Sequence, residues 1–118
     1  MNITIDIPDD KIQNALHSAF TGGIAYWGRL ADCSAIAAGP LSAEVMRPRG
    51  YVHLRVLPGL ADKMPRPRSL NRRSVAIGLQ LMALHAPGHF AMLLHGTGDM
   101  NTGDLLVQYA VFGKAVFG

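Results

Sequence analysis

The chain has few of the residues that would place it in a specialised class of protein. It holds one cysteine, Cys33, among 118 residues, which excludes an intramolecular disulfide and a zinc site built from several cysteines. Charged residues make up only 16% and apolar residues 49%, a balance that excludes a disordered chain. No apolar run reaches the roughly 18–20 residues that span a bilayer, and the first ten residues alternate and carry acids, unlike a signal peptide. We therefore expect a single cytoplasmic domain, residues 1–118, with no membrane segment.

The sequence also lacks the common motifs of catalytic and cofactor sites. It contains no G-x-x-x-x-G-K-[ST] phosphate loop and no G-x-G-x-x-G dinucleotide motif. His85 and His89 lie four apart, but a proline and a glycine between them break the helical face that a metal pair needs. Residues 99–104 resemble the start of a calcium loop, yet Ala110 stands where the bidentate glutamate belongs. No nucleophile has a visible partner, so we expect no metal, no cofactor and no enzymatic activity.

Basic residues are concentrated in one segment. Between residues 47 and 73, eight basic residues oppose one acid, Asp62, so the segment carries +7 and leaves −4 for the rest of a chain with net charge +3. Seven of the eight are arginines, whose planar guanidinium groups bind phosphate and carboxylate oxygens in bidentate fashion. An anion-binding surface and an ordinary solvated loop both remain open on this evidence. The binding hypothesis places the partner on Arg66, Arg68, Arg72 and Arg73, with Arg47 and Arg49 as lesser contributors.

Hydrophobic periodicity predicts an α+β chain with strands before helices. Strands are expected at residues 2–7, 24–30, 44–46 (short and weaker) and 51–57. Helices are expected from residue 9 to the glycine pair at 22–23, from about 70 to 85 with Ser69 or Asn71 as its cap, at 89–94, and at 102–112. The expected fold is an N-terminal antiparallel sheet of three to four strands with one early helix, packed by C-terminal helices. Residues 59–69 hold two prolines, Pro65 and Pro67, and are expected to form an irregular loop.

The apolar positions of these elements predict the core and an assembly. The core is expected to contain Ile5, Leu16, Phe20, Leu54, Ile77, Leu81, Phe90, Leu106 and Phe112. On the helix that ends at residue 85, the inward face is expected to hold Leu70, Ile77, Leu81 and Leu84, widened by Val75, Leu79 and Met82. So short a chain leaves part of its apolar surface outside, which is typical of an oligomer. We expect a homodimer or a higher homo-oligomer.

Tyr26 and Trp27 form the most informative local feature. They follow Gly22-Gly23 and lie in a predicted strand, where neighbouring side chains point to opposite faces. One ring therefore faces the core, and the other can stack on a base or accept an arginine at the surface. The alternative, that both rings pack inside, remains open. Tyr26 and Trp27 are accordingly candidate binding residues.

Three segments carry longer motifs: GGIAYWGRL from residue 22, GLQLMALHAPGHF at 78–90 and TGDLLVQYAVFGKAVFG at 102–118. Together they resemble a family of small, largely uncharacterised proteins encoded by phages and prophages. The matching positions are Gly22, Gly23, Tyr26, Trp27, Gly78, Leu79, Met82, Ala83, Pro87, His89, Phe90, Thr102, Asp104, Gln108, Phe112, Gly113 and Gly118. Three features depart from the family: arginines and prolines replace its mid-chain acids, Phe117 replaces a tyrosine, and Gly103 replaces an alanine.

The resemblance implies a phage accessory protein, a setting in which small proteins commonly counter host defence. With the arginine segment, it leads to the expectation of a non-enzymatic anti-defence protein that acts by binding in the host cytoplasm. It would inhibit a defence protein such as a CRISPR effector, or sequester an anionic nucleotide signal. The alternative is a nucleic-acid-binding accessory protein, whose affinity would depend steeply on salt.

Overall fold

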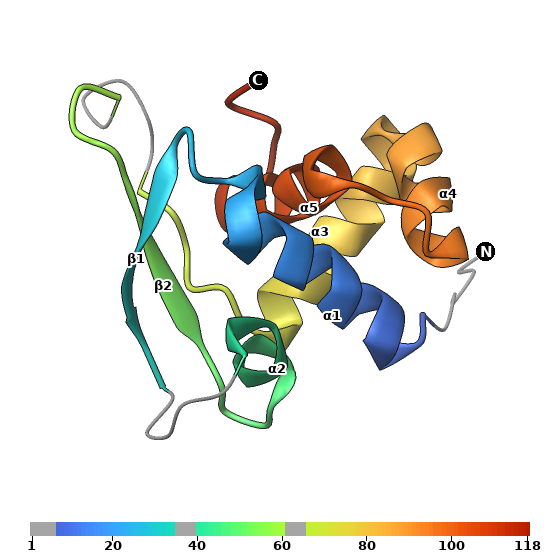
Figure 1. Cartoon of the computed structure of the whole chain (residues 1–118), viewed down its shortest axis with the longest axis horizontal. Helices are drawn as coiled ribbons and strands as arrows, with labels where there is room; N and C mark the ends of the chain where they lie inside the picture. Colours follow the sequence, from blue (N-terminus) through green and yellow to red (C-terminus); the bar gives the residue numbers. More distant parts are fainter. Residues whose placement is uncertain (1–6, 35–39, 61–65) are drawn as a thin grey trace.

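Two antiparallel strands and a group of helices confirm the expected α+β class. The computed structural model describes residues 7–34, 40–60 and 66–118 (Figure 1). The elements, in order, are α1 (Asp9–Ser18), the π-helical turn η1 (Ala19–Gly23), β1 (Gly28–Cys33), α2 (Leu41–Met46), β2 (Val52–Val56), α3 (Arg72–His85), α4 (Pro87–His95) and α5 (Met100–Phe112). In Figure 1 the ribbon of β1 and β2 runs along one side of the molecule, and α1, α3, α4 and α5 pack together on the other. None of the helices within the described ranges is long and apolar enough to cross a membrane.

The sheet is smaller than predicted. Over the described residues it consists of β1 and β2 alone, with one isolated bridge between Val52 and Leu70 beside β2. The strand predicted at 44–46 is wrong, because these residues complete α2, in which Leu41 and Val45 have the i, i+4 spacing of one helical face. Of the strand predicted at 2–7, residues 2–6 lie outside the described residues, and so does the core candidate Ile5.

The strand predicted at 24–30 begins four residues late, at Gly28. The carbonyl of Ile24 accepts from the N–H groups of Trp27 (3.0 Å) and Gly28 (2.9 Å), so residues 24–27 form a turn. This turn follows the glycine pair that the sequence singled out. A Cβ on Gly23 would lie 2.5 Å from the Met100 carbonyl oxygen, so only glycine allows η1 to approach the start of α5 this closely.

The ends of the long helices follow the sequence closely. Asn71 caps α3, with its side chain accepting from the Ser74 N–H at 2.8 Å and the Ser74 hydroxyl accepting from the Asn71 N–H in return. Asp99 caps α5 by accepting from the N–H groups of Asn101 and Thr102. Pro87 opens α4, where a missing N–H costs nothing.

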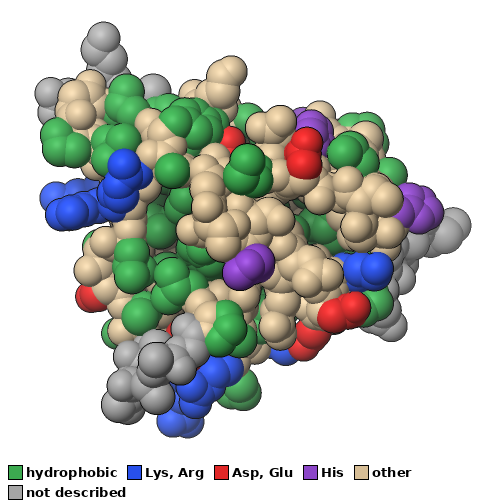
Figure 2. Space-filling view, viewed as in Figure 1, with side chains coloured by type: hydrophobic (Ala, Val, Ile, Leu, Met, Phe, Trp, Pro, Cys, Tyr) green, Lys and Arg blue, Asp and Glu red, His purple; other side chains and the backbone are tan. Residues whose placement is uncertain are grey.

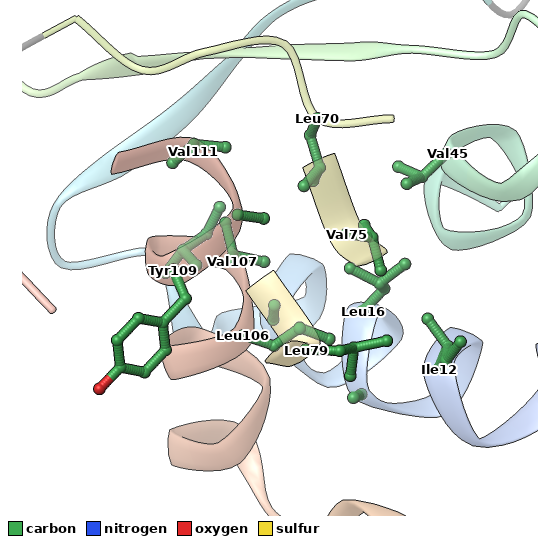
Figure 3. Close-up of a cluster of buried hydrophobic side chains, with 14 of the residues drawn as sticks. Ile12, Leu16, Val45, Leu70, Val75, Leu79, Leu106, Val107, Tyr109 and Val111 are labelled. Atoms are coloured by element: carbon green, nitrogen blue, oxygen red, sulfur yellow. The ribbon is translucent and has the colours of Figure 1, made fainter. Parts of the chain in front are cut away.

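The core lies where α1, α3 and α5 meet, and α3 turns a different face to it than predicted. Leu16, Leu54, Leu106 and Phe112 are buried as expected, and Phe20, Leu81 and Phe90 are half-buried. Ile77 and Leu84, however, are 40% and 72% exposed, so their placement in the core is wrong. Figure 3 shows Val75 and Leu79 of α3, which were predicted at the margin of the inward face, beside Leu16 and Leu106.

Gly78 explains why α3 is rotated. A Cβ there would lie 2.9 Å from the Ala110 nitrogen, so at this glycine α3 packs directly against the backbone of α5. The crossing directs Val75, Leu79 and Met82 inward and leaves Ile77 and Leu84 outside. A pattern that counts only apolar residues misses this, because the residue of α3 that packs against α5 is a glycine and carries no side chain.

Candidate functional site

A pocket of about 490 Å³ lies where the turn after α2, strand β2 and the start of α3 come together. Its lining is formed mainly by Arg47, Arg49, Tyr51, His53, Ser69, Asn71, Arg72 and Arg73. We call it the arginine pocket. In Figure 2 basic side chains lie beside the ribbon of β1 and β2 and at its lower end, next to α2.

Four of the six arginines predicted from the sequence line the pocket, but they are not the four that were predicted as the main contacts. Arg47 and Arg49, expected to be lesser contributors, line it together with Arg72 and Arg73. Arg66 and Arg68 are exposed but do not line it. Instead, the Arg68 N–H donates to the Val111 carbonyl at 2.9 Å and fixes this segment to the end of α5.

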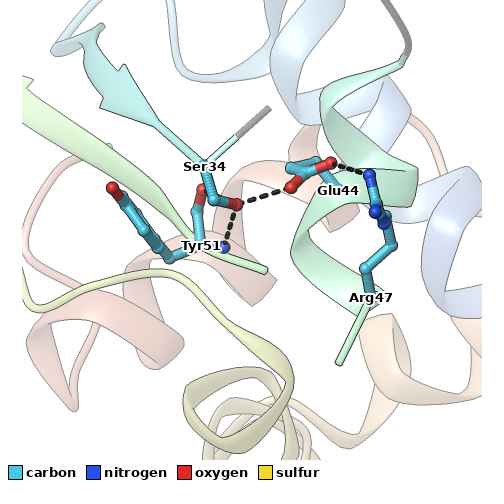
Figure 4. A network of polar contacts seen from close by, with 4 residues as sticks. All are labelled: Ser34, Glu44, Arg47 and Tyr51. Atoms are coloured by element: carbon cyan, nitrogen blue, oxygen red, sulfur yellow. Dashed lines mark hydrogen bonds and ion pairs between the residues drawn. The ribbon is translucent and has the colours of Figure 1, made fainter. Parts of the chain in front are cut away.

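One wall of the pocket is held by a buried carboxylate (Figure 4). Glu44 accepts from the Arg47 guanidinium at 3.1 Å and from the Ser34 hydroxyl at 2.5 Å. The Tyr51 N–H donates to the same hydroxyl at 2.9 Å. Glu44 is 7% exposed, so a buried carboxylate connects α2 to the residue after β1 and, through the Ser34 hydroxyl, to the residue before β2. The arrangement orients Arg47 and Tyr51 before any ligand arrives.

The opposite wall belongs to α3. Arg72 donates to the Met46 carbonyl at 3.1 Å and to the Asp9 carboxylate at 2.9 Å, which ties α3 to α1 and α2. The N–H groups of Arg72 and Arg73 are the first two of the helix and have no hydrogen-bond partner among the described residues. Such groups, at the positive end of the helix dipole, attract anions.

The four arginines are unequally neutralised. Among the described residues two arginines of the pocket form ion pairs, Arg47 with Glu44 and Arg72 with Asp9. Arg49 and Arg73 pair with no carboxylate of the same ranges. The pocket therefore holds two guanidinium groups whose charge no described acid balances at contact distance.

Arg49 is also held in an unfavourable backbone conformation. Its φ of +62° lies in the left-handed region, which a residue with a long side chain rarely adopts. The next residue, Gly50, packs so tightly that a Cβ would lie 1.9 Å from the Glu44 carbonyl oxygen. Gly50 also closes the turn by donating to the Arg47 carbonyl at 2.9 Å. Strain of this kind is commonly found at functional sites.

A row of three polar side chains crosses the pocket edge, and the sequence analysis missed it. His53 Nδ1 lies 2.6 Å from Asp32 Oδ1, and His53 Nε2 lies 2.6 Å from Ser69 Oγ. The Tyr51 ring lies beside the imidazole, with 4.6 Å between ring centroids. No local motif could have found this row, because its members are 16 and 21 residues apart and meet only through strand pairing.

The other two sequence candidates, Tyr26 and Trp27, belong to a second polar cluster away from the pocket. Trp27 is fully buried, so its indole is not available as a surface stacking platform. It donates to Asp104 Oδ1 at 2.8 Å, and the Tyr26 hydroxyl donates to Asp104 Oδ2 at 2.5 Å. Gln108 donates to Asp104 Oδ1 at 2.9 Å. We call Tyr26, Trp27, Asp104 and Gln108 the Asp104 cluster.

The Asp104 cluster fixes the C-terminal segment. The side-chain oxygen Oε1 of Gln108 accepts from the N–H groups of Val116 (2.7 Å) and Phe117 (2.8 Å). The Phe117 ring then stacks on Trp27, with 5.3 Å between centroids and 10° between planes. Two of the three motif segments thus meet here, one contributing Tyr26 and Trp27 and the other Asp104, Gln108 and Phe117.

Burial affects the titration of Tyr26. Partial burial, and then its hydrogen bond to Asp104, raise the pKa of Tyr26 to about 12. The phenol is thus held in its neutral form, as a donor to the carboxylate.

Comparison with known proteins does not assign the site. No protein-family model, no curated protein and no solved structure matches this chain. Within the described residues no group of three or more His, Cys, Asp and Glu side chains is placed to hold a metal ion.

Proposed function

We propose that this protein binds a phosphate-bearing ligand of nucleotide size in the arginine pocket, and that it counters host antiviral defence as a phage accessory protein. The observation that carries the proposal is the pocket itself, in which four arginines from two chain segments line one space beside the N-terminus of α3. Guanidinium groups and helix N–H groups both favour phosphate oxygens. The phage setting rests on the sequence resemblance.

The form of the pocket favours a small ligand over an extended one. Its volume of about 490 Å³ falls in the range of small-molecule sites, roughly 300–1,000 Å³. Tyr51 supplies an aromatic surface among the arginines, suited to a base. A pocket of this size suits a nucleotide, whereas a defence protein would bind to a flatter surface. The pocket therefore favours sequestration of a nucleotide signal over inhibition of a defence protein. We propose that the protein acts by binding.

The binding test is isothermal titration with inorganic phosphate, nucleoside triphosphates and cyclic dinucleotides. The double variant Arg49→Asn with Arg73→Gln removes the two guanidinium groups that have no described acid partner. Each charge-assisted hydrogen bond contributes about 1.5–3 kcal/mol, so affinity should fall at least about tenfold. The control is Arg55→Gln, an exposed arginine of β2 outside the pocket, which should leave affinity unchanged. Equal losses in both would contradict the pocket assignment.

The same experiment separates the alternative of nucleic-acid binding. Random duplex DNA is added at low and high salt, because neutralisation of phosphates by a basic surface produces a steep salt dependence. Binding of duplex in place of nucleotides, weakened by Arg55→Gln as much as by the pocket variant, would favour the alternative.

A plaque assay in cells with a nucleotide-signalling defence then tests the phage role: the wild-type protein should restore infection and the pocket variant should not.

The oligomeric state stays a prediction. Ile77 and Leu84 lie seven residues apart on α3, on one face, and both are exposed. Their apolar area fits the expectation of a homodimer. Light scattering at micromolar concentration should give twice the mass of one chain, 12.7 kDa, and a mass of one chain would end the idea.

A further inference from the structure

The row Asp32, His53, Ser69 is set by backbone pairing. The register of β1 and β2 puts Asp32 opposite His53. On the other side of β2, Val52 pairs antiparallel with Leu70, with bonds of 2.8 and 2.9 Å in the two directions. One step along that antiparallel pair, His53 stands opposite Ser69. The three side chains therefore lie in line across three neighbouring segments, held by the ladder beneath them.

A bulge in β1 selects the aspartate. The register advances from Leu30 to Asp32 on β1, while it advances by only one residue on β2. With regular pairing, Ala31 would face His53, and the imidazole would have no carboxylate beside it. Bulges re-aim side chains and are frequent next to active sites.

Hydrogen-bond chemistry favours one arrangement of the protons in this row. An ionised carboxylate only accepts, so His53 Nδ1 carries the hydrogen that Asp32 accepts. In the neutral imidazole, Nε2 is then an acceptor, and the Ser69 hydroxyl donates its proton to it. This is the proton arrangement of a serine nucleophile, its general base and a carboxylate that fixes the tautomer.

We propose that Ser69 is a nucleophile and His53 its general base, in a site that cleaves carboxylic esters of anionic compounds. Ser69 and His53 both line the arginine pocket, so an anion held by Arg49 and Arg73 lies in the same space as the hydroxyl. The inference rests on the proposed function, because the arginine pocket must first bind the anionic substrate. It adds catalysis to that binding. It departs from the sequence-based expectation of no enzymatic activity.

The chemistry needs only water as a co-reactant. Ser69 Oγ attacks the ester carbonyl carbon and its proton passes to His53 Nε2, while the carbonyl π electrons move to the oxygen. When the tetrahedral intermediate collapses, the ester C–O bond breaks and the leaving alkoxide takes the proton from Nε2. Water then attacks the acyl-serine, again giving a proton to Nε2. The acyl C–Oγ bond breaks, Oγ recovers that proton, and a carboxylic acid leaves.

Exposure sets the roles within the row. The Asp32 side chain is 64% exposed and that of His53 is 42% exposed. Solvent screens the Asp32 charge, so Asp32 acts as a positioning residue that holds the tautomer and ring orientation. We expect a slow esterase, and covalent labelling is therefore a more sensitive test than turnover.

The first test is reaction with a fluorophosphonate, followed by peptide mass mapping. The wild-type protein should gain one adduct, on Ser69, and Ser69→Ala should gain none. His53→Gln should slow labelling by about 100-fold, since general-base catalysis is worth about 10²–10⁴. Ser18→Ala, a serine outside the pocket, is the matched control and should label like the wild type. Absence of an adduct, or an adduct rate unchanged in His53→Gln, would overturn the proposal.

Asp32→Asn tests the positioning role. Labelling should slow by about tenfold, less than the roughly 10⁴-fold loss for a buried triad carboxylate, because solvent screens the exposed Asp32 charge. Nitrogen-15 NMR should show His53 with its proton on Nδ1 in the wild type and a mixture of tautomers in Asp32→Asn. A slower rate with an unchanged tautomer would contradict this role.

A test with two ester substrates separates this proposal from the proposed function. 4-Nitrophenyl succinate should be cleaved with a kcat/KM about tenfold above that of neutral 4-nitrophenyl acetate, a preference lost in the Arg49→Asn, Arg73→Gln variant. Nucleotide binding that survives Ser69→Ala, in a protein that fluorophosphonate does not label, refutes the esterase and retains the binding function. Labelling of Ser69 without any anion preference or nucleotide binding refutes the binding function and the anionic substrate class.

Discussion

The Asp104 cluster and the arginine pocket are both polar, yet their groups are satisfied in opposite ways. In the Asp104 cluster a carboxylate 6% exposed accepts from three donors, and within the described ranges no buried side-chain nitrogen or oxygen lacks a partner. In the arginine pocket, Arg49 and Arg73 pair with none of the described carboxylates. In a closed network the hydrogen bonds hold the chain together. In an open one some donors remain available to a ligand.

This difference implies that substitutions in the two regions should separate stability from binding. Removing a member of the closed network leaves buried groups without partners, a cost that folding bears. Removing an open arginine leaves nothing buried behind, so the loss appears in ligand affinity. The following predictions test this separation, beginning with the largest expected change in the free energy of unfolding.

Asp104→Ala should give the largest loss of stability. It removes the acceptor of the Trp27 indole, the Tyr26 hydroxyl and the Gln108 amide together. An unsatisfied buried polar group costs about 1–3 kcal/mol, so the free energy of unfolding should fall by about 3 kcal/mol or more in urea titrations. Asp104→Asn keeps one acceptor oxygen for the indole and should lose less. Equal losses for Ala and Asn would show that packing, rather than hydrogen bonding, holds this site.

Gly103→Ala tests the close packing beneath the cluster. A Cβ at residue 103 would lie 2.3 Å from the Ala15 carbonyl oxygen, so α1 and α5 would have to separate. We expect the free energy of unfolding to fall by about 1–3 kcal/mol, the usual cost of overpacking. The matched control is Gly88→Ala in α4, where a Cβ meets nothing within 4 Å and alanine favours the helix. A Gly103→Ala protein as stable as the control would show a looser contact between α1 and α5.

The sequence predicted the helices better than the sheet, for physical reasons that particular residues show. Local signals at Asn71, Asp99 and Pro87 mark helix ends because capping acts over three or four residues. The inward face of α3 depends on Gly78 against Ala110, a contact between distant segments, and the prediction of Ile77 in the core failed there.

The candidate site was predictable only in part. The density of arginines in the sequence raises an anion site as one of two interpretations, but which of the arginines converge depends on the turn at Arg49 and Gly50. The row through His53 depends on strand register and on one bulge, neither of which leaves a pattern in the sequence. Trp27 shows the converse, because an aromatic residue that favours recognition at a surface serves equally well inside a core.

Alkaline pH should weaken the Asp104 cluster through Tyr26. The folded-state pKa is raised to about 12, above the ordinary value of 10.0, so the contribution to stability is complete below pH 10 and is lost as the pH rises through 12. Because the ring is half exposed, solvent screening reduces the effect to about 1 kcal/mol. Urea titrations from pH 9 to 12 should show a steeper loss for the wild type than for Tyr26→Phe. Parallel curves would show that the phenol is not held neutral by the fold.

Arg49→Asn should change stability least and ligand binding most clearly. At φ +62° an arginine is strained, and asparagine tolerates this conformation better, so the substitution should leave the free energy of unfolding unchanged or raise it by up to about 1 kcal/mol. Nucleotide affinity should fall at the same time, because one of the two guanidinium groups without a described acid partner is lost. Calorimetric titration and urea denaturation of the same preparation check both halves. A less stable protein with full affinity would invert the comparison: the strained turn at Arg49 would then serve the fold, and the binding site would have to be sought among the arginines outside the pocket.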